Sequence, residues 1–314
     1  MSDATGDLQT MTLPDGRTFE YLVEGDPDGY PLVHHHGTPG AAVPFPKYAE
    51  AAKERGLKLI QYSRAGYAGS SPRPGRAVAD GVENLVVVGG DGMVHIAVQA
   101  VAETDTNLGL IPCGTGNDVA RYLGIPRKDP QLAADVVVGS RVRTVDLAKA
   151  GPTYFTTVLA SGFDSKVNER ANAMARPKGQ MRYNIATLAE LKVFEPLPYV
   201  LDLDGVERRV EAMTVAVGNG ESFGGGLRIT HGALLDDGML DVVIVKPMSK
   251  RRLVRVYPML FSGKHVGIPE YEHHRVRSVT VAAPGIVAYA DGERLGPLPL
   301  TVDAVPGALR VLVP

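Results

Sequence analysis

The sequence has one cysteine, no tryptophan and no apolar run that approaches the roughly 20 residues of a membrane-spanning helix. Because Cys113 stands alone, the chain can form no internal disulfide and no cysteine-based zinc site, which fits a reducing, cytoplasmic setting. Neither sign of charge is in excess, since 33 Lys and Arg face 35 Asp and Glu, for a net charge of -2. This balance argues against a nucleic-acid-binding protein with a basic face. We expect any membrane contact to be peripheral.

The 314 residues predict about two domains, and their 44% hydrophobic and 22% charged composition is ordinary for a folded protein. Residues 1–82 begin with a strand–helix–strand pattern and end in a loop rich in Gly, Ser, Pro and Arg. Residues 83–140 alternate strands with helices, which predicts a parallel, helix-covered sheet. Residues 141–314 are rich in strands and predict a β-sandwich-like second domain with helical insertions. The expected fold class is therefore α/β, followed by a β-sandwich-like domain.

Two glycine-rich loops each follow a short apolar strand and open a helix. Gly89-Gly90-Asp91-Gly92 follows the strand 85–88, and Gly114-Thr115-Gly116-Asn117-Asp118 follows the strand 108–111. Glycines let backbone N–H groups approach a phosphate, and the helix N-terminus adds partial positive charge. One such loop alone is as well explained by a tight turn. Two loops in succession favour a phosphate-binding crevice at the carboxyl edge of the sheet.

Further motifs follow these loops in a fixed order. They comprise 112–121, 161–164, 179–183, 219, 224–226, 235–241 and the Asp-Gly-Glu of 291–293. Together with 89–92, they resemble the diacylglycerol kinase catalytic domain family, which includes the sphingosine kinases, over about residues 83–314. The resemblance implies transfer of the γ-phosphoryl group of ATP to a hydroxyl of diacylglycerol or a related lipid, with Mg²⁺ as the ion.

The resemblance also implies roles for particular residues. Those expected to bind ATP are Gly89, Gly90, Asp91, Gly92, Met93, Val94, His95, Gly114, Thr115, Gly116, Asn117 and Asp118. The catalytic base is expected to be Asp291 or Glu293, and the family pattern favours Glu293. Taken alone, Asp-Gly-Glu is more often just a hairpin turn.

A structural magnesium site is implied between residues 234 and 239. The family pattern places its ligands at Asp237, with Asp236 beside it, and at the backbone oxygens of Leu234 and Met239. Carboxylate and carbonyl oxygens suit Mg²⁺, although a surface turn would explain the same residues. The implied partner is a lipid substrate at a membrane surface, and a homodimer stays open.

The chain departs from the family pattern in two places. Met93 stands where the family usually has Thr, and no Asn-Pro-x-x-Gly phosphate loop precedes residue 83. Residues 1–80 instead resemble the opening of an α/β-hydrolase, through 13–17, 34–40 and 62–71. Because Gly89-Gly90-Asp91-Gly92-Met93 stands where an α/β-hydrolase has its Gly-x-Ser-x-Gly elbow, with Asp in place of Ser, hydrolysis is the least favoured function. The main alternative is a catalytically impaired member that binds nucleotide or lipid.

Three hypotheses concern the less familiar segments. The hydrolase-like unit is expected to dock beside residues 85–88 and complete the sheet. The loop 37–40 is a candidate substitute for the missing phosphate loop, because it also lies between a strand and a helix. Finally, Arg251, Arg252 and Arg255, near Lys246 and Lys250, could bind anionic lipid headgroups, although a solvated helix face is the simpler explanation.

Overall fold

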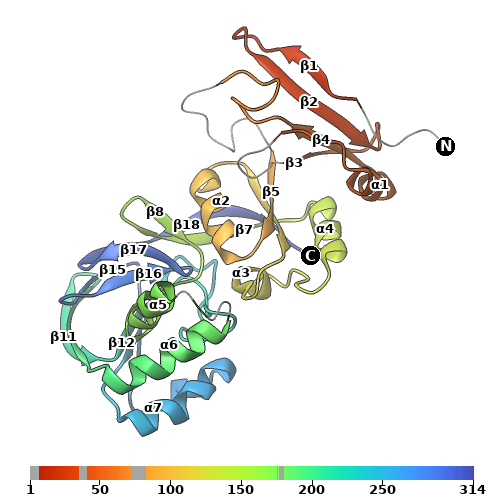
Figure 1. Cartoon of the computed structure of the whole chain (residues 1–314). Coiled ribbons are helices and arrows are strands. Elements are labelled where there is room, and N and C mark those ends of the chain that lie inside the picture. The colour runs from red at the N-terminus through yellow and green to blue at the C-terminus, as the bar shows by residue number, and fades with distance from the viewer. Residues whose placement is uncertain (1–6, 35–40, 73–82, 175, 177–179) are drawn as a thin grey trace.

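The computed structural model describes residues 7–34, 41–72, 83–174, 176 and 180–314 (Figure 1). The loop 37–40, proposed above as a substitute phosphate loop, lies outside the described residues. No helix of the described residues is long and apolar enough to cross a membrane.

The N-terminal unit forms a sheet of its own. Its elements are β1 (Gln9–Thr12), β2 (Thr18–Gly25), β3 (Tyr30–His34), α1 (Pro46–Glu54) and β4 (Leu57–Tyr62). The strand order is β1-β2-β4-β3, in which only β3 and β4 are parallel. Helix α1 covers one face because Ala49 and Ala52 are buried on the side that packs against the strands.

The unit contacts the next domain without extending its sheet. The side chain of Asn84 donates a hydrogen bond of 2.8 Å to the hydroxyl of Tyr30, and Arg55 lies 3.4 Å from Asp135. Val138 packs against the small apolar cluster of the unit. The predicted docking beside residues 85–88 is therefore present. The predicted completion of the sheet is wrong for the described residues, because β3 and the neighbouring strand share no hydrogen-bonded ladder there.

The next domain is built on two adjacent parallel strands. Its elements are β5 (Asn84–Gly89), α2 (Asp91–Val101), β6 (Asn107–Pro112), α3 (Asp118–Tyr122) and α4 (Pro130–Gly139). Val88 lies opposite Ile111 in the ladder, so β5 and β6 end at the same edge. These short apolar strands are nearly continuous in Val, Leu and Ile, as is typical of strands covered on both faces.

Strands from the rest of the chain complete that sheet. They are β7 (Val142–Ala150), β8 (Thr153–Phe155), β10 (Leu197–Leu203), β11 (Val206–Ala212), β15 (Ser278–Ala282) and β18 (Leu300–Leu312). The order is β11-β10-β15-β18-β6-β5, with β7 also pairing with β18 and β8 pairing with β7. The C-terminal strand β18 pairs in parallel with β6, so the last residues of the chain join both domains into one sheet.

A second sheet faces the far part of the first one. It contains β9 (Val158–Gly162), β12 (Thr214–Gly218), β13 (Leu240–Val245), β14 (Tyr271–Val276), β16 (Val287–Ala290) and β17 (Glu293–Pro297). Fully buried side chains from both sheets, among them Leu201 and Val279 on one and Val217 and Val242 on the other, form a common core. The predicted α/β fold with a β-sandwich-like second domain is confirmed.

Helices lie at the end of the sandwich away from the N-terminal unit (Figure 1). They are α5 (Phe163–Ala173), α6 (Gln180–Val193), α7 (Lys250–Val256) and the 3₁₀ turns η1 (Tyr257–Ser262) and η2 (Lys264–Gly267). The sequence predicts that α6 buries a stripe containing Met181, Ile185 and Phe194. Phe194 is buried, but Met181 and Ile185 are exposed. Periodicity predicts which residues share a face of the helix, but it does not predict how much of that face another element covers.

Candidate active site

The two glycine-rich loops touch each other. A Cβ atom added to Gly114 would lie 2.5 Å from Cα of Gly90, and one added to Gly90 would lie 3.0 Å from Cα of Gly114. Backbone therefore meets backbone, and only glycine fits at this contact. The loops meet because β5 and β6 are parallel neighbours whose carboxyl ends share one edge.

Asp91 fixes the second loop by capping α3. Its Oδ1 accepts hydrogen bonds from the backbone N–H groups of Asp118 at 2.7 Å and Val119 at 3.4 Å. The sequence suggests Asn117 as the cap, but that residue has a left-handed φ of 51° and bonds through its side chain to both backbone polar groups of Gly114. Burial, and then the charge of Asp118, raise the pKa of Asp91. Asp91 thus links the two loops across the crevice.

Asp118 connects these loops to a third glycine-rich turn. Its buried carboxylate accepts from the N–H of Gly225 at 2.7 Å and the hydroxyl of Ser222 at 3.0 Å, and it pairs with Arg121. Gly225 has φ of 87°, which favours glycine. The motif 224–226 is therefore brought to the same crevice as the first two loops.

These segments enclose a cavity of about 420 Å³. The described residues on its polar side include Gly90, Asp91, Gly92, Gly114, Thr115, Gly116, Asp118, Gly225, Asp291 and Glu293. Nine of the residues predicted for ATP or catalysis therefore lie on one cavity wall. The remaining residues of the predicted ATP set, which are Gly89, Met93, Val94, His95 and Asn117, are not on that wall. Val94 lies in the core beneath α2, while Asn117 shapes the second loop from behind.

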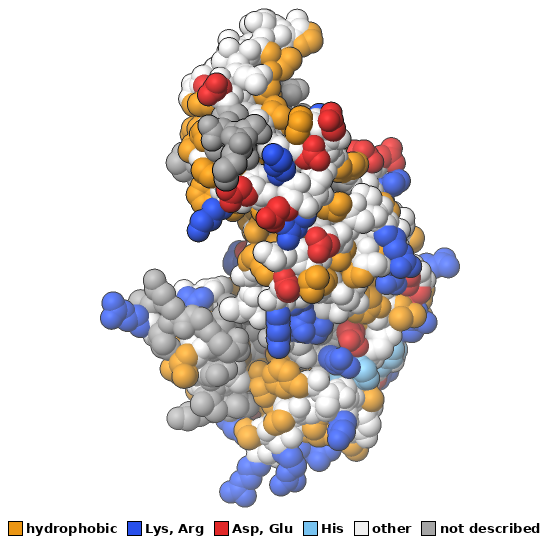
Figure 2. Space-filling model, turned by 90° about the vertical axis from the view of Figure 1, so that its right-hand side faces the viewer, with side chains coloured by type: hydrophobic (Ala, Val, Ile, Leu, Met, Phe, Trp, Pro, Cys, Tyr) orange, Lys and Arg blue, Asp and Glu red, His pale blue; other side chains and the backbone are white. Residues whose placement is uncertain are grey.

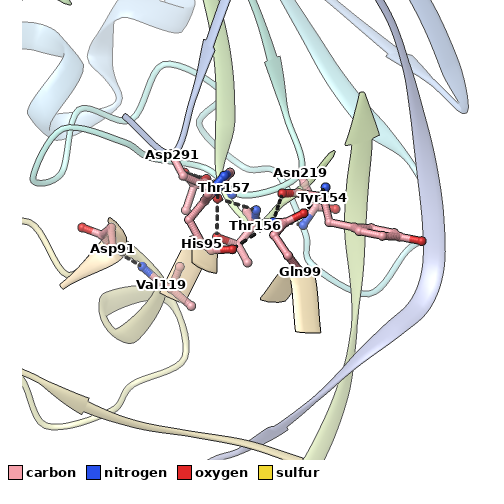
Figure 3. A network of polar contacts seen from close by, with 9 residues as sticks. All are labelled: Asp91, His95, Gln99, Val119, Tyr154, Thr156, Thr157, Asn219 and Asp291. Carbon is pink, nitrogen blue, oxygen red and sulfur yellow. Dashed lines mark hydrogen bonds and ion pairs between the residues drawn. The ribbon is translucent and has the colours of Figure 1, made fainter. Parts of the chain in front are cut away.

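The Asp291-Gly292 hairpin turn brings the catalytic candidates into the cavity. Both residues have positive φ, 51° and 87°, as a two-residue hairpin with the right twist requires. The Asp291 carboxylate accepts from the backbone N–H of Thr156 at 2.9 Å and of Thr157 at 2.8 Å, and from both threonine hydroxyls (Figure 3). Nδ1 of His95 donates a fifth bond of 3.2 Å.

The two acidic residues of this turn have different surroundings. Burial alone would raise the pKa of Asp291, but the hydrogen bonds from His95, Thr157 and the backbone outweigh it and lower the pKa. Asp291 is therefore a weak base with its acceptor positions occupied. Glu293 is exposed to the cavity, and its Oε1 lies 3.4 Å from the point where a Cβ of Gly92 would stand. Its carboxylate makes no hydrogen bond with the part of the chain that the structure describes.

A network behind Asp291 holds the threonine pair in place. The side chain of Asn219 donates to the carbonyl of Thr156 at 3.0 Å, and Gln99 exchanges hydrogen bonds with the backbone of Tyr154 (Figure 3). Gln99 also donates to the carbonyl of His95 at 2.9 Å. Helix α2 is thus joined to β8, and Asn219 holds the threonine pair that follows this strand.

Asp164 is a functional candidate that the sequence argument leaves without a role. It lines the cavity, and its carboxylate accepts a hydrogen bond of 3.1 Å from the hydroxyl of Thr214. Protein atoms surround the carboxyl group, and this burial raises its pKa to about 6. A carboxyl group with a raised pKa in a cleft is typical of functional sites. The only signal in the sequence is its place in the motif 161–164.

An apolar pocket adjoins the cavity. Both spaces are lined by Phe163, Asp164, Phe223, Leu227 and Tyr257, so they share a wall. The pocket itself is lined mainly by apolar side chains from α7, η1 and the second sheet. The site therefore has a polar end at the glycine loops and an apolar end beneath α7.

The predicted magnesium loop lies apart from this cavity. Oδ1 of Asp237 accepts a hydrogen bond of 3.0 Å from the N–H of Met239, and Oδ2 pairs with Arg275. Leu234 is half exposed. A cation at Asp237 would have to displace the guanidinium of Arg275. Within the described ranges no cluster of three or more His, Cys, Asp or Glu is arranged to hold a metal. The residues as arranged do not fit the ion, and this site stays a prediction.

Protein contacts hold the loop in this arrangement. The buried Asp146, which the sequence argument misses, accepts from the N–H groups of Gly238 and Gly307, each at 2.7 Å. Asp236, the other predicted acidic ligand, pairs with Arg143 at 2.7 Å. Asp146 therefore supplies the negative charge at the centre of the turn.

Two family models match the chain. The diacylglycerol kinase catalytic domain matches residues 37–150, and the YegS C-terminal NAD kinase beta sandwich-like domain matches residues 157–313. The first match begins inside the segment 1–82 that the sequence analysis treats as hydrolase-like.

Relatives agree with these matches. A diacylglycerol kinase of Mycobacterium tuberculosis is 45% identical over 291 residues, covering 90% of this chain and 93% of the relative. A diacylglycerol kinase of Bacillus subtilis is 30% identical over 219 residues, covering 68% of this chain and 72% of the relative.

Solved structures share the fold. A putative diacylglycerol kinase from Bacillus anthracis is 25% identical, with a TM-score of 0.61 over 74% of this chain and 78% of that chain. Another diacylglycerol kinase structure from this organism is 22% identical and has a TM-score of 0.65 over 91% and 97% of the two chains. The chain therefore belongs to the diacylglycerol kinase family of lipid kinases, as its ordered motifs predict.

Proposed function

We propose that the protein transfers the γ-phosphoryl group of ATP to the hydroxyl of diacylglycerol or a closely related lipid. The observation that carries this proposal is the meeting of two glycine loops and Glu293 on one cavity that adjoins an apolar pocket. One end suits an anionic phosphate chain and the other suits the hydrocarbon part of a lipid. To catalyse phosphoryl transfer between ATP and the lipid, the protein mainly has to position the two substrates, and it need not form a covalent bond to either.

The polyphosphate of ATP would lie against the bare backbone at Gly90 and Gly114. No side chain fits between these two glycines, because a Cβ on either one would clash with the backbone of the other. The N-terminus of α2 begins at Asp91, so its first N–H groups add partial positive charge. Mg²⁺ would accompany the nucleotide and neutralise charge that develops on the transferred group.

Glu293 would accept the proton of the lipid hydroxyl. Its carboxylate lies beside Gly92, at the N-terminal turn of α2. Asp291 would act as a positioning residue, because its carboxylate is already occupied by five donors. The base is thus mounted on a turn that hydrogen bonds fix in place.

The test is phosphate transfer from ATP to diacylglycerol in neutral mixed micelles. We expect Glu293→Gln to lower kcat by about 100-fold or more, because a general base contributes roughly 10² to 10⁴ in rate. Glu211→Gln, an equally conservative change on the exposed strand β11, is the matched control and should retain full activity.

Two results would contradict the proposal. Full activity of the Glu293→Gln variant would show that Glu293 is not the general base. ATP binding by the unaltered protein without any transfer would favour the catalytically impaired alternative, for which Met93 and the missing Asn-Pro-x-x-Gly loop are the arguments. Hydrolysis of a chromogenic ester by the same preparation would instead support the hydrolase-like reading of residues 1–82.

A further inference from the structure

The connection between β13 and β14 carries an excess of positive charge. Residues 246–270 contain six Lys and Arg and one acidic residue, Glu270, although the whole chain has a net charge of -2. This connection forms α7, η1 and η2 at the end of the molecule opposite the N-terminal unit (Figure 1). Its charge is therefore concentrated in one place.

Only part of this positive charge is neutralised by the protein. Arg252 pairs with Glu270 through two hydrogen bonds, and Lys246 pairs with Glu272 at 2.7 Å. Arg251, Arg255 and Lys264 are exposed and have no ion pair with any residue that the structure describes. Arg251 and Arg255 are four positions apart on α7, so they lie on one face of the helix.

Large apolar side chains are exposed among these cations. Val254 is 55% exposed, Phe261 is 52% exposed and Val266 is 43% exposed. In Figure 2, blue and orange side chains cover the lower end of the molecule, where Figure 1 places α7. We use the name α7–η2 surface for the exposed set Arg251, Val254, Arg255, Phe261, Lys264 and Val266.

The inner side of the same connection lines the apolar end of the active-site cavity. Leu253, Val256, Tyr257 and Leu260 face that pocket, and Tyr257 also lines the polar cavity. The α7–η2 surface and the apolar end of the site therefore lie on opposite sides of the same segment. A lipid that lies against this surface would be adjacent to the site.

We propose that the α7–η2 surface docks the protein on anionic phospholipid membranes. The inference rests on the proposed lipid kinase function and names the face that meets the substrate's membrane. Unpaired cations suit anionic headgroups, and exposed apolar side chains among them suit the boundary between headgroups and acyl chains. A nucleic acid would use the cations but leave Phe261 and Val254 without an apolar partner.

The experiment is sedimentation of the full chain with vesicles of phosphatidylcholine containing about one third phosphatidylglycerol. We expect Arg251→Glu/Arg255→Glu to weaken vesicle binding by about 10-fold or more, since each reversed charge changes attraction to repulsion. Phe261→Ser should weaken binding further at high salt, where screening leaves the apolar contribution. Arg127→Glu/Lys128→Glu, on the exposed loop after α3, makes the same change in net charge and should bind normally.

Activity in neutral detergent micelles separates this inference from the proposed function. If the surface only docks the protein, the Arg251→Glu/Arg255→Glu variant keeps its micellar activity while it loses vesicle binding. Equal binding by this variant and the unaltered protein overturns the docking surface, and so does an equal loss in the control variant. Absence of micellar transfer by the unaltered protein overturns the kinase function, whatever the vesicles show.

Discussion

The hydrogen bond between His95 and Asp291 joins side chains that are 196 positions apart in the chain. It ties the second turn of α2 to the hairpin that carries Glu293, so both sides of the cavity depend on it. The bond from Asp291 raises the pKa of His95, and burial opposes this only in part. His95 therefore holds the hairpin through Asp291, while the contact with ATP that the family resemblance implies for it stays a prediction.

His95→Gln should remove a pH dependence of stability. Because the pKa of His95 is higher in the folded state than its ordinary value of 6.5, its stabilisation is complete below about pH 6.5 and is lost as pH rises through the folded-state pKa. We expect a loss of about 1 to 2 kcal/mol in the variant at pH 6 and less at pH 9. Thermal unfolding across this range measures the difference.

His231→Gln provides the comparison for that experiment, because His231 pairs with Glu221 at the surface. The pH profile of phosphate transfer should change with His95→Gln and not with His231→Gln. A variant at position 95 that keeps the wild-type profiles of both stability and transfer would show that the His95–Asp291 bond has no positioning role.

At the scale of elements, the site depends on two βα turns pressed against each other. Their packing distance is set by the spacing of parallel strands, and neither turn could hold a side chain at the contact. Asp91 then fixes α3, a helix of five residues that is too short to be stable by itself. The turns therefore form one unit, in which a change in either loop is transmitted to the other.

Gly114→Ala should weaken nucleotide binding and stability together. Its Cβ would stand 2.5 Å from Cα of Gly90, and backbone cannot move aside as a flexible side chain can. We expect a destabilisation of about 1 to 3 kcal/mol and a clear rise in the dissociation constant of a non-hydrolysable ATP analogue, measured by calorimetry. Gly139→Ala, where an added Cβ meets no atom within 4 Å, should change neither. Unaltered affinity in Gly114→Ala would place the nucleotide elsewhere.

At the scale of the whole molecule, the three sheets are joined in different ways. The strand β18 pairs with β6, β7 and β15, so it crosses from the sandwich into the domain built on β5 and β6. The N-terminal unit is held differently, by Asn84, by the ion pair of Arg55 with Asp135, and by apolar packing on Val138. Because exposed ion pairs contribute little, the apolar contact should dominate.

Val138→Asp should release the N-terminal unit. A carboxylate placed against the apolar cluster of Leu57 and Leu59 would lose its hydration without a partner, which favours separation. We expect faster proteolysis within residues 41–72, followed by mass spectrometry, while the sandwich stays resistant. Leu132→Asp, on the exposed face of the same helix, is the control. Identical digestion of both variants would mean that apolar packing on α4 does not hold the unit.

The strands, the glycine turns and the family can be predicted from the amino-acid sequence, because they depend on local periodicity and on residue types at short spacing. The hairpin at Asp291-Gly292 follows from two residues that tolerate positive φ. Three features come from the folded structure alone: Asp91 rather than Asn117 caps α3, His95 bonds to Asp291, and Asp164 faces the cavity. The physical reason is that these contacts join segments 27 and 196 positions apart, or depend on burial. Strand pairing and packing determine both the long-range contacts and the burial, and no local sequence pattern predicts either.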